Sequence, residues 1–227
     1  MTLSFWDVCV RLIFATACGG IIGVERGRKN RPAGFRTYIL VCVGSALTMI
    51  LSAYLVAMNG TWEYIVTTDF SRFGAQVING IGFLGAGTII ITGKNQVKGM
   101  TTAAGLWASA CLGLAIGAGF YVGAAVACLL MILTVTVFAK IELFVMSKSR
   151  NITIYIEFDT ADNITEIVER IKSREVRIFD VELIKASQGG TKYPSAILVM
   201  RLPKKLTHTA LITEIARVDA VRLIEEL

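Results

Sequence analysis

The chain is poor in the side chains on which metal and nucleophilic chemistry usually depend. It contains one histidine, His208, and no two of its five cysteines form a C-x-x-C pair. All five lie within apolar runs: Cys9, Cys18, Cys42, Cys111 and Cys128. Zinc sites need closely spaced ligands, and disulfide frameworks need paired thiols. The sequence therefore argues against both and favours packing roles for the thiols.

Acidic residues are scarce in the first two-thirds of the chain. Residues 1–150 hold 12 Lys/Arg but only 5 Asp/Glu, and residues 101–139 hold no charge at all. With neither a histidine nor a carboxylate pair there, this region lacks the usual groups for acid–base catalysis. We therefore expect no catalytic residue and no enzyme activity.

Hydrophobic residues and glycine are abundant in the same region. Hydrophobic residues make up 54% of the chain, and 19 of the 21 glycines lie before residue 150. A run of about 20 apolar residues spans the ~30 Å hydrocarbon core of a membrane. Runs at 5–24, 37–58 and 73–92, with two helices in 101–139 joined by a tight turn near 117–121, predict a five-helix transmembrane domain over 1–140. Glycines allow close helix packing in lipid, which we expect at Gly19, Gly23, Gly80, Gly82, Gly85 and Gly87.

Basic residues indicate the orientation in the membrane. The loop at 25–36 carries five Lys/Arg, and short loops rich in these residues stay in the cytoplasm. The sequence therefore predicts a multi-pass membrane protein with its N-terminus outside and its C-terminus in the cytoplasm. The basic surplus suits membrane lipid rather than nucleic acid. Arg11, inside the first run, either points into the bundle and pairs with Asp7 or extends to the nearer interface.

Residues 151–227 have the composition of a soluble domain, with 11 Lys/Arg against 12 Asp/Glu. Alternating and helical apolar patterns give the order β-α-β-β-α-β, which is typical of an α+β ferredoxin-like fold. A turn is expected at Gly189–Gly190, and residues 141–150 are expected to link the two regions.

Two groups of polar residues are candidates for function. The first would lie at the cytoplasmic face, where Glu25 is expected to pair with Arg36 or Arg26; the alternative is that this cluster only anchors helices at the lipid headgroups. Its members are Glu25, Arg26, Arg36, Thr37, Lys98, Thr101 and Thr102.

The second group would lie on one face of the third span and lead inward from the outer surface. Polar side chains within a span usually face the bundle interior; their alternative role is hydrogen bonding between helices. Its members are Asp69, Arg72, Gln76 and Asn79.

Cofactor and metal sites are not expected. Gly80, Gly82 and Gly85 match a dinucleotide fingerprint, but they lie within an apolar run and no acidic residue follows at the required distance. Mg²⁺ prefers carboxylate oxygens, and the predicted topology places Glu25 and Asp69 on opposite faces. Nearby arginines would also repel a divalent cation.

Three motifs together resemble the MgtC/SapB family of membrane proteins. They are GVER at 23–26 with AGFRT at 33–37; Asp69 and Arg72 with AQV at 75–77 and GIGFLGAG at 80–87; and VKGMTTAA at 97–104 with Leu106 and Trp107. The C-terminal region is similar in pattern to the ACT-like domain of many members.

The resemblance implies a location in the bacterial inner membrane, a part in coping with low magnesium and, in some members, survival inside host cells. It also implies action on partner membrane complexes, the proton-driven ATP synthase among them, and a small-molecule or homodimerisation role for the C-terminal domain. Two functions stay open: regulation of partner complexes, and an ion (Mg²⁺) transporter or channel whose path is Asp69, Gln76 and Asn79.

Overall fold

The computed structural model describes residues 4–59, 69–92, 96–147, 149–160, 162–184, 193–204 and 206–227. The chain divides into a helical unit, Met1–Ile90 with Val97–Glu142, and a second unit that contains Leu143–Leu227. The predicted turn at Gly189–Gly190 lies outside the described residues.

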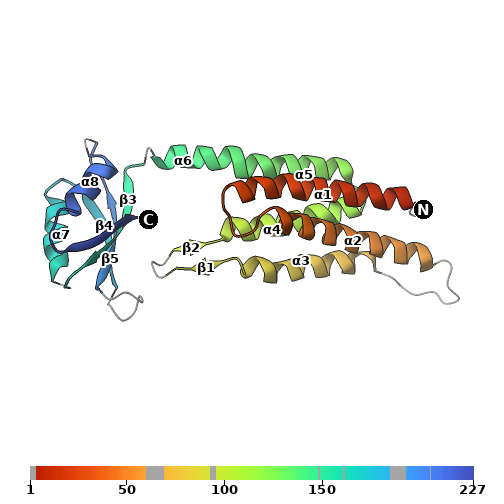
Figure 1. Ribbon diagram of the computed structural model, residues 1–227, viewed down its shortest axis with the longest axis horizontal. Coiled ribbons are helices and arrows are strands. Elements are labelled where there is room, and N and C mark those ends of the chain that lie inside the picture. The colour runs from red at the N-terminus through yellow and green to blue at the C-terminus, as the bar shows by residue number, and fades with distance from the viewer. Residues whose placement is uncertain are drawn as a thin grey trace. The chain divides into compact units, whose positions relative to one another are not determined.

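Five helices of the first unit lie side by side (Figure 1): α1 Phe5–Arg28, α2 Phe35–Asn59, α3 Phe70–Ala86, α4 Met100–Gly117 and α5 Tyr121–Leu133. A π-helical turn, η1 Thr134–Phe138, and α6 Ala139–Ser147 continue α5. The short strands β1 Ile90–Ile91 and β2 Val97–Lys98 pair between α3 and α4. The segment expected as a linker, 141–150, is therefore helical as far as Ser147.

Four helices in the described part of the chain are long and apolar enough to cross a membrane: α1, α2, α4 and the continuous helix Tyr121–Met146. The predicted tight turn is confirmed, because α4 ends at Gly117 and α5 begins at Tyr121. The third span, predicted over 73–92, is instead a 17-residue helix that ends at Ala86. At ~1.5 Å per residue it is about 25 Å long, so α3 is not among the four candidate spans.

Close packing of α1, α2 and α4 forms the core of the helical unit. A Cβ added at Gly19 would lie 2.7 Å from the carbonyl oxygen of Tyr38, and one added at Gly23 would lie 2.7 Å from Cα of Phe35. Gly113 lies so close to the Cys42 backbone that a Cβ would overlap its oxygen. The predicted packing role of Gly19 and Gly23 is thus confirmed, since only glycine permits these approaches.

The glycines of α3, unlike the tightly packed glycines of α1 and α4, do not lie at close contacts between helices. No atom of the described residues lies within 4 Å of a Cβ built at Gly80 or Gly82, and Gly85 would make an ordinary 3.5 Å contact with Ala103. A Cβ at Gly87 would approach only the preceding turn of its own helix. The prediction of tight packing within this chain is wrong for Gly80, Gly82 and Gly87, because the face of α3 that carries the first two is open.

The second unit is a small sheet with two helices. Its elements are β3 Asn151–Phe158, α7 Asn163–Lys172, β4 Arg177–Ile184, β5 Ser195–Arg201, α8 His208–Ile215 and β6 Val221–Glu226. The strand order is β4-β5-β3-β6, and every adjacent pair is antiparallel. Alternate residues of β3, among them Ile154 and Ile156, are buried in one core with Ile167 of α7 and Leu211 of α8.

Candidate functional site

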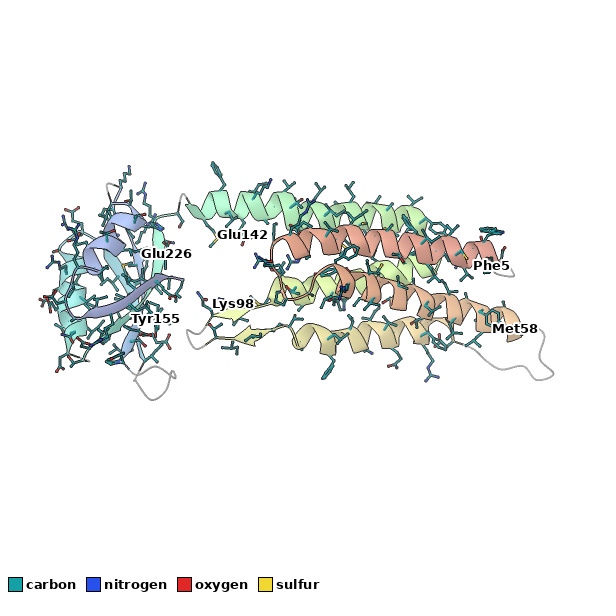
Figure 2. All side chains as sticks on the ribbon, in the orientation of Figure 1. Phe5, Met58, Lys98, Glu142, Tyr155 and Glu226 are labelled. Carbon is teal, nitrogen blue, oxygen red and sulfur yellow. The ribbon has the colours of Figure 1, made fainter. Side chains whose placement is uncertain are left out.

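One end of the helical unit gathers the basic side chains around a pocket of about 860 Å³. The last turn of α1, the loop after it, the β2–α4 junction and the helix η1–α6 form its walls. Figure 2 shows Lys98 and Glu142 at this end, which we call the basic end, and Phe5 and Met58 at the opposite end.

Arg26 is fixed in the wall of this pocket. Its side chain is 4% exposed, and its Nη2 donates a hydrogen bond of 3.0 Å to Oγ1 of Thr102, which is 2% exposed. The Nε of Arg26 is buried and has no hydrogen-bond partner in the part of the chain that the structure describes. This hydrogen bond joins residues 76 positions apart in the chain and fixes the Arg26 guanidinium between α1 and α4.

The sequence predicted that Glu25 pairs with Arg26 or Arg36. In the structure Glu25 pairs with Lys29 instead. The Nζ of Lys29 lies 2.5 Å from Oε1 of Glu25 and donates a hydrogen bond of 2.7 Å to the carbonyl oxygen of Val135. Oε2 of Glu25 is buried and accepts no hydrogen bond. The physical reason is local: Lys29 lies one turn further along the same helix, whereas Arg36 is exposed on the first turn of α2.

Some of the other members of the predicted cluster line the pocket and others do not. Lys98 and Thr101 line the pocket with Arg26 and Thr102, so the structure brings these four together. Arg36 and Thr37 are exposed and lie outside the lining. Sequence reasoning missed Lys29, whose i, i+4 spacing from Glu25 was the available signal. It also missed the contribution of η1, for which the sequence offers no comparable signal.

At the opposite end, the second predicted group does not face the interior. Asp69, Arg72, Gln76 and Asn79 are all exposed in the chain. Arg72 and Gln76 border an open hollow with Thr48 of α2. The prediction of an inward path along α3 is therefore wrong for this chain alone: α3 packs against α2 and α4 through its other face.

Asp69 caps α3. Its Oδ1 accepts hydrogen bonds from the Ser71 hydroxyl at 2.6 Å and the Ser71 backbone N–H at 2.9 Å. These bonds to the ionised carboxylate, the hydroxyl first, lower the pKa of Asp69 below its usual value. Its structural role is thus to satisfy an amide in the first turn of α3.

Arg11 points inward, but its partner is not Asp7. Its Nη1 donates a hydrogen bond of 2.7 Å to the carbonyl oxygen of Gly117 at the end of α4. Asp7 instead accepts a hydrogen bond of 3.1 Å from the backbone N–H of Ser4. A cation at a helix C-terminus is favourable because the last carbonyls there lack partners.

Within the described ranges, no group of three or more His, Cys, Asp or Glu side chains converges as a metal site would require. Glu25 lies on the last turns of α1 at the basic end, and Asp69 lies at the start of α3 at the other. The chemistry that the basic end offers is therefore the binding of negative charge by fixed donors.

Comparison with known proteins finds several similar sequences. Protein SapB of Bacillus subtilis (strain 168) is 31% identical over 227 residues, covering 97% of each chain. The Escherichia coli (strain K12) protein named "Putative magnesium transporter YhiD" is 40% identical over 149 residues, covering 66% of this chain and 67% of its own. Protein MgtC of Brucella abortus (strain 2308) is 45% identical over 116 residues, covering 50% of this chain and 44% of its own.

No solved structure gives a significant match. The MgtC family matches residues 12–144, which hold the basic end, α3 and most of the apolar helices. This multi-pass membrane protein therefore belongs to the MgtC family.

Proposed function

We propose that this protein regulates the response to magnesium limitation by binding and modulating partner complexes in the bacterial inner membrane. Its N-terminus lies outside and its C-terminus in the cytoplasm, and α3 completes a five-helix bundle. The name of the Escherichia coli relative, a putative magnesium transporter, supports the link to magnesium. The Lys/Arg residues of the loop at 25–36 support the orientation.

The observation that supports partner binding is the open face of α3. Gln76 and Asn79 are exposed, and no atom of the described residues lies within 4 Å of a Cβ added at Gly80 or Gly82. Amide side chains facing lipid would have no hydrogen-bond partner, which is unfavourable. Small residues beside polar ones are the surface through which membrane helices associate.

Photo-crosslinking in cell membranes tests the proposal. A photoreactive residue at 79, on the open face, is compared with one at 126, where Val126 of α5 is also exposed but is apolar. We expect discrete crosslinks to a membrane complex from 79 and mainly lipid adducts from 126. With the photoreactive residue at 79, Gln76→Leu should abolish the crosslink, and the combined Gln76→Leu and Asn79→Leu substitutions should abolish growth at low magnesium. Unaltered growth together with identical products from both positions would exclude this role for α3.

Ion transport is the second candidate function, and the name of the Escherichia coli relative, a putative magnesium transporter, favours it. Its proposed path, Asp69, Gln76 and Asn79, would have to be completed by another chain, since all three residues are exposed here. Magnesium flux into vesicles that contain the purified protein, lost in Asp69→Ala, would favour transport over regulation.

For the C-terminal unit we propose a ferredoxin-like, ACT-like domain that dimerises or binds a small molecule. The strand order β4-β5-β3-β6, with all adjacent pairs antiparallel, supports that fold. The edge strand β4 exposes Phe179, Val181 and Leu183. Exposed apolar side chains on an unpaired edge suit a contact with a second copy.

A further inference from the structure

The pocket at the basic end has an electrostatic character that its role in helix packing does not require. Arg26, Lys29, Arg31 and Lys98 line it, against the single acidic lining residue Glu142. Glu25 already neutralises Lys29 through their ion pair. The lining therefore keeps a net positive charge, and its volume of about 860 Å³ falls within the range of small-molecule sites.

Two independent features favour negative charge in this space. The first is Arg26, which lines the pocket, is only 4% exposed and has an Nε with no hydrogen-bond partner among the described residues. Burying a charged group without completing its hydrogen bonds is costly. An anion in the pocket would offset part of that cost through its charge.

The second feature is the N-terminus of α4. Gly99 is its N-cap and has φ +98°, and no side chain caps the helix. The first-turn amides of Met100, Thr101 and Thr102 lack intrahelical acceptors, and all three residues line the pocket. Free amides at a helix N-terminus, with the helix dipole behind them, favour a negatively charged ligand.

Part of the remaining wall is apolar, although Asn30 and Thr134 also line the pocket. Val97, Met100 and Phe138 line the pocket and are 45%, 59% and 60% exposed. Phe138 belongs to the π-helical turn η1, a type of distortion that occurs frequently at functional sites. The pocket thus pairs donors from several directions with an apolar surface, which fits a multi-oxygen anion attached to an organic group.

We propose that the pocket at the basic end binds a phosphate group, through Arg26, Arg31, Lys98 and the first-turn amides of α4. Either an anionic phospholipid headgroup or a soluble phosphorylated compound carries that group. Both kinds of ligand carry a phosphate, and the apolar part of the wall contacts the rest of the ligand.

The full-length protein in nanodiscs tests this proposal in two arms. The first arm measures, by native mass spectrometry, the phosphatidylglycerol retained from discs that mix it with phosphatidylcholine. The second arm titrates inorganic pyrophosphate against the protein in discs of phosphatidylcholine alone. We expect saturable binding in at least one arm; the lipid arm alone identifies a headgroup, and the pyrophosphate arm identifies a soluble ligand.

Matched variants decide whether the pocket is responsible. Arg31→Gln and Lys98→Gln alter exposed side chains, so folding should be kept, and each should weaken binding about tenfold. Arg26→Gln should abolish binding, while Arg28→Gln, on the same helix end but outside the lining, should leave it unchanged. Absence of saturable binding in both arms overturns the proposal. Equal weakening by Arg28→Gln and Lys98→Gln does so too, because it would indicate a general charge effect.

Discussion

Arg11 and Gly117, 106 positions apart in the chain, are joined by a hydrogen bond of 2.7 Å from the guanidinium Nη1 to the carbonyl oxygen. The chain reverses direction immediately after this carbonyl, and Gly119 in the turn has φ +84°. A Cβ at Gly119 would lie 3.2 Å from Nη2 of Arg11. Arg11 therefore fixes the α4–α5 turn against α1, which explains a charge inside the first apolar run.

Removal of this contact should destabilise the helical unit. Arg11→Ala leaves the Gly117 carbonyl without its charged donor, and bonds of that kind contribute about 1.5–3 kcal/mol. For a chain of this size, we expect the midpoint of thermal unfolding in detergent to fall by roughly 3 to 10 °C. Arg28→Ala, at the exposed end of the same helix, should change it by less than about 2 °C. Equal shifts in the two variants would contradict the role of Arg11.

Glycines on the two kinds of helix face should respond oppositely to alanine. Gly113→Ala pushes a methyl group into the Cys42 backbone, and overpacking of this kind typically costs about 1–3 kcal/mol. Gly80→Ala meets no atom within 4 Å and should be neutral or stabilising by up to about 1 kcal/mol through helix propensity. Unfolding in detergent compares the two directly, and a loss of stability in Gly80→Ala would show that its face is covered in the purified protein.

The sequence was sufficient to predict the positions of α1, α2 and the turn between α4 and α5, but not the end of α3 or the neighbours of each helix face. Apolar runs bounded by charge located α1 and α2, and the absence of charge over 101–139 located the turn at Gly117. The same helical spacing that placed Gln76 and Asn79 on one face could not tell whether that face meets α2 or lies open. Whether that face is covered depends on how the other helices pack. The spacing of residues along one helix does not predict this packing.

At the candidate site too, the sequence predicted several of the residues that lie together but not all of their contacts. Arg26, Lys98, Thr101 and Thr102 were identified because the predicted topology places them at one end of the bundle. The pairing of Glu25 was predicted incorrectly because five basic residues lie within 25–36, and composition cannot rank them. The i, i+4 geometry of α1 decides in favour of Lys29, so local helix spacing was a better guide than the number of charges nearby.

The cap formed by Asp69 should depend on pH. Hydrogen bonds from Ser71 hold the pKa of Asp69 below its usual value, so the folded-state pKa is lower than the unfolded one. The contribution of the cap is therefore complete above the ordinary aspartate pKa of about 3.9 and is lost as the pH falls through the lowered value. We expect amide exchange in the first turn of α3, corrected for intrinsic rates, to rise severalfold only in that acidic range.

The matched variant for this measurement is Asp69→Asn, which keeps a side-chain oxygen for the Ser71 amide but does not titrate. Its corrected exchange should be independent of pH, whereas Asp69→Ala should exchange fast at every pH. A pH-dependent response in Asp69→Asn would assign the effect to another group.

The proposed contact between C-terminal units predicts which edge of the sheet meets a second copy. In the order β4-β5-β3-β6, the two edges are β4 and β6. Phe179 of β4 is 62% exposed and Leu223 of β6 is 37% exposed, so a cysteine can be placed on either edge without disturbing the core. With a short bifunctional maleimide reagent, Phe179→Cys in the full-length protein should form a covalent dimer in membranes, and Leu223→Cys should not.

Charge repulsion provides the complementary experiment, since β4 would lie against β4 in a symmetric pair. Adding Leu183→Asp to the Phe179→Cys variant places like charges across that contact and should reduce the crosslinked fraction by about tenfold. The thermal unfolding of the domain should change little, because Leu183 is 57% exposed. A dimer that forms equally well through Leu223→Cys, or that survives Leu183→Asp, would mean that β4 is not the interface.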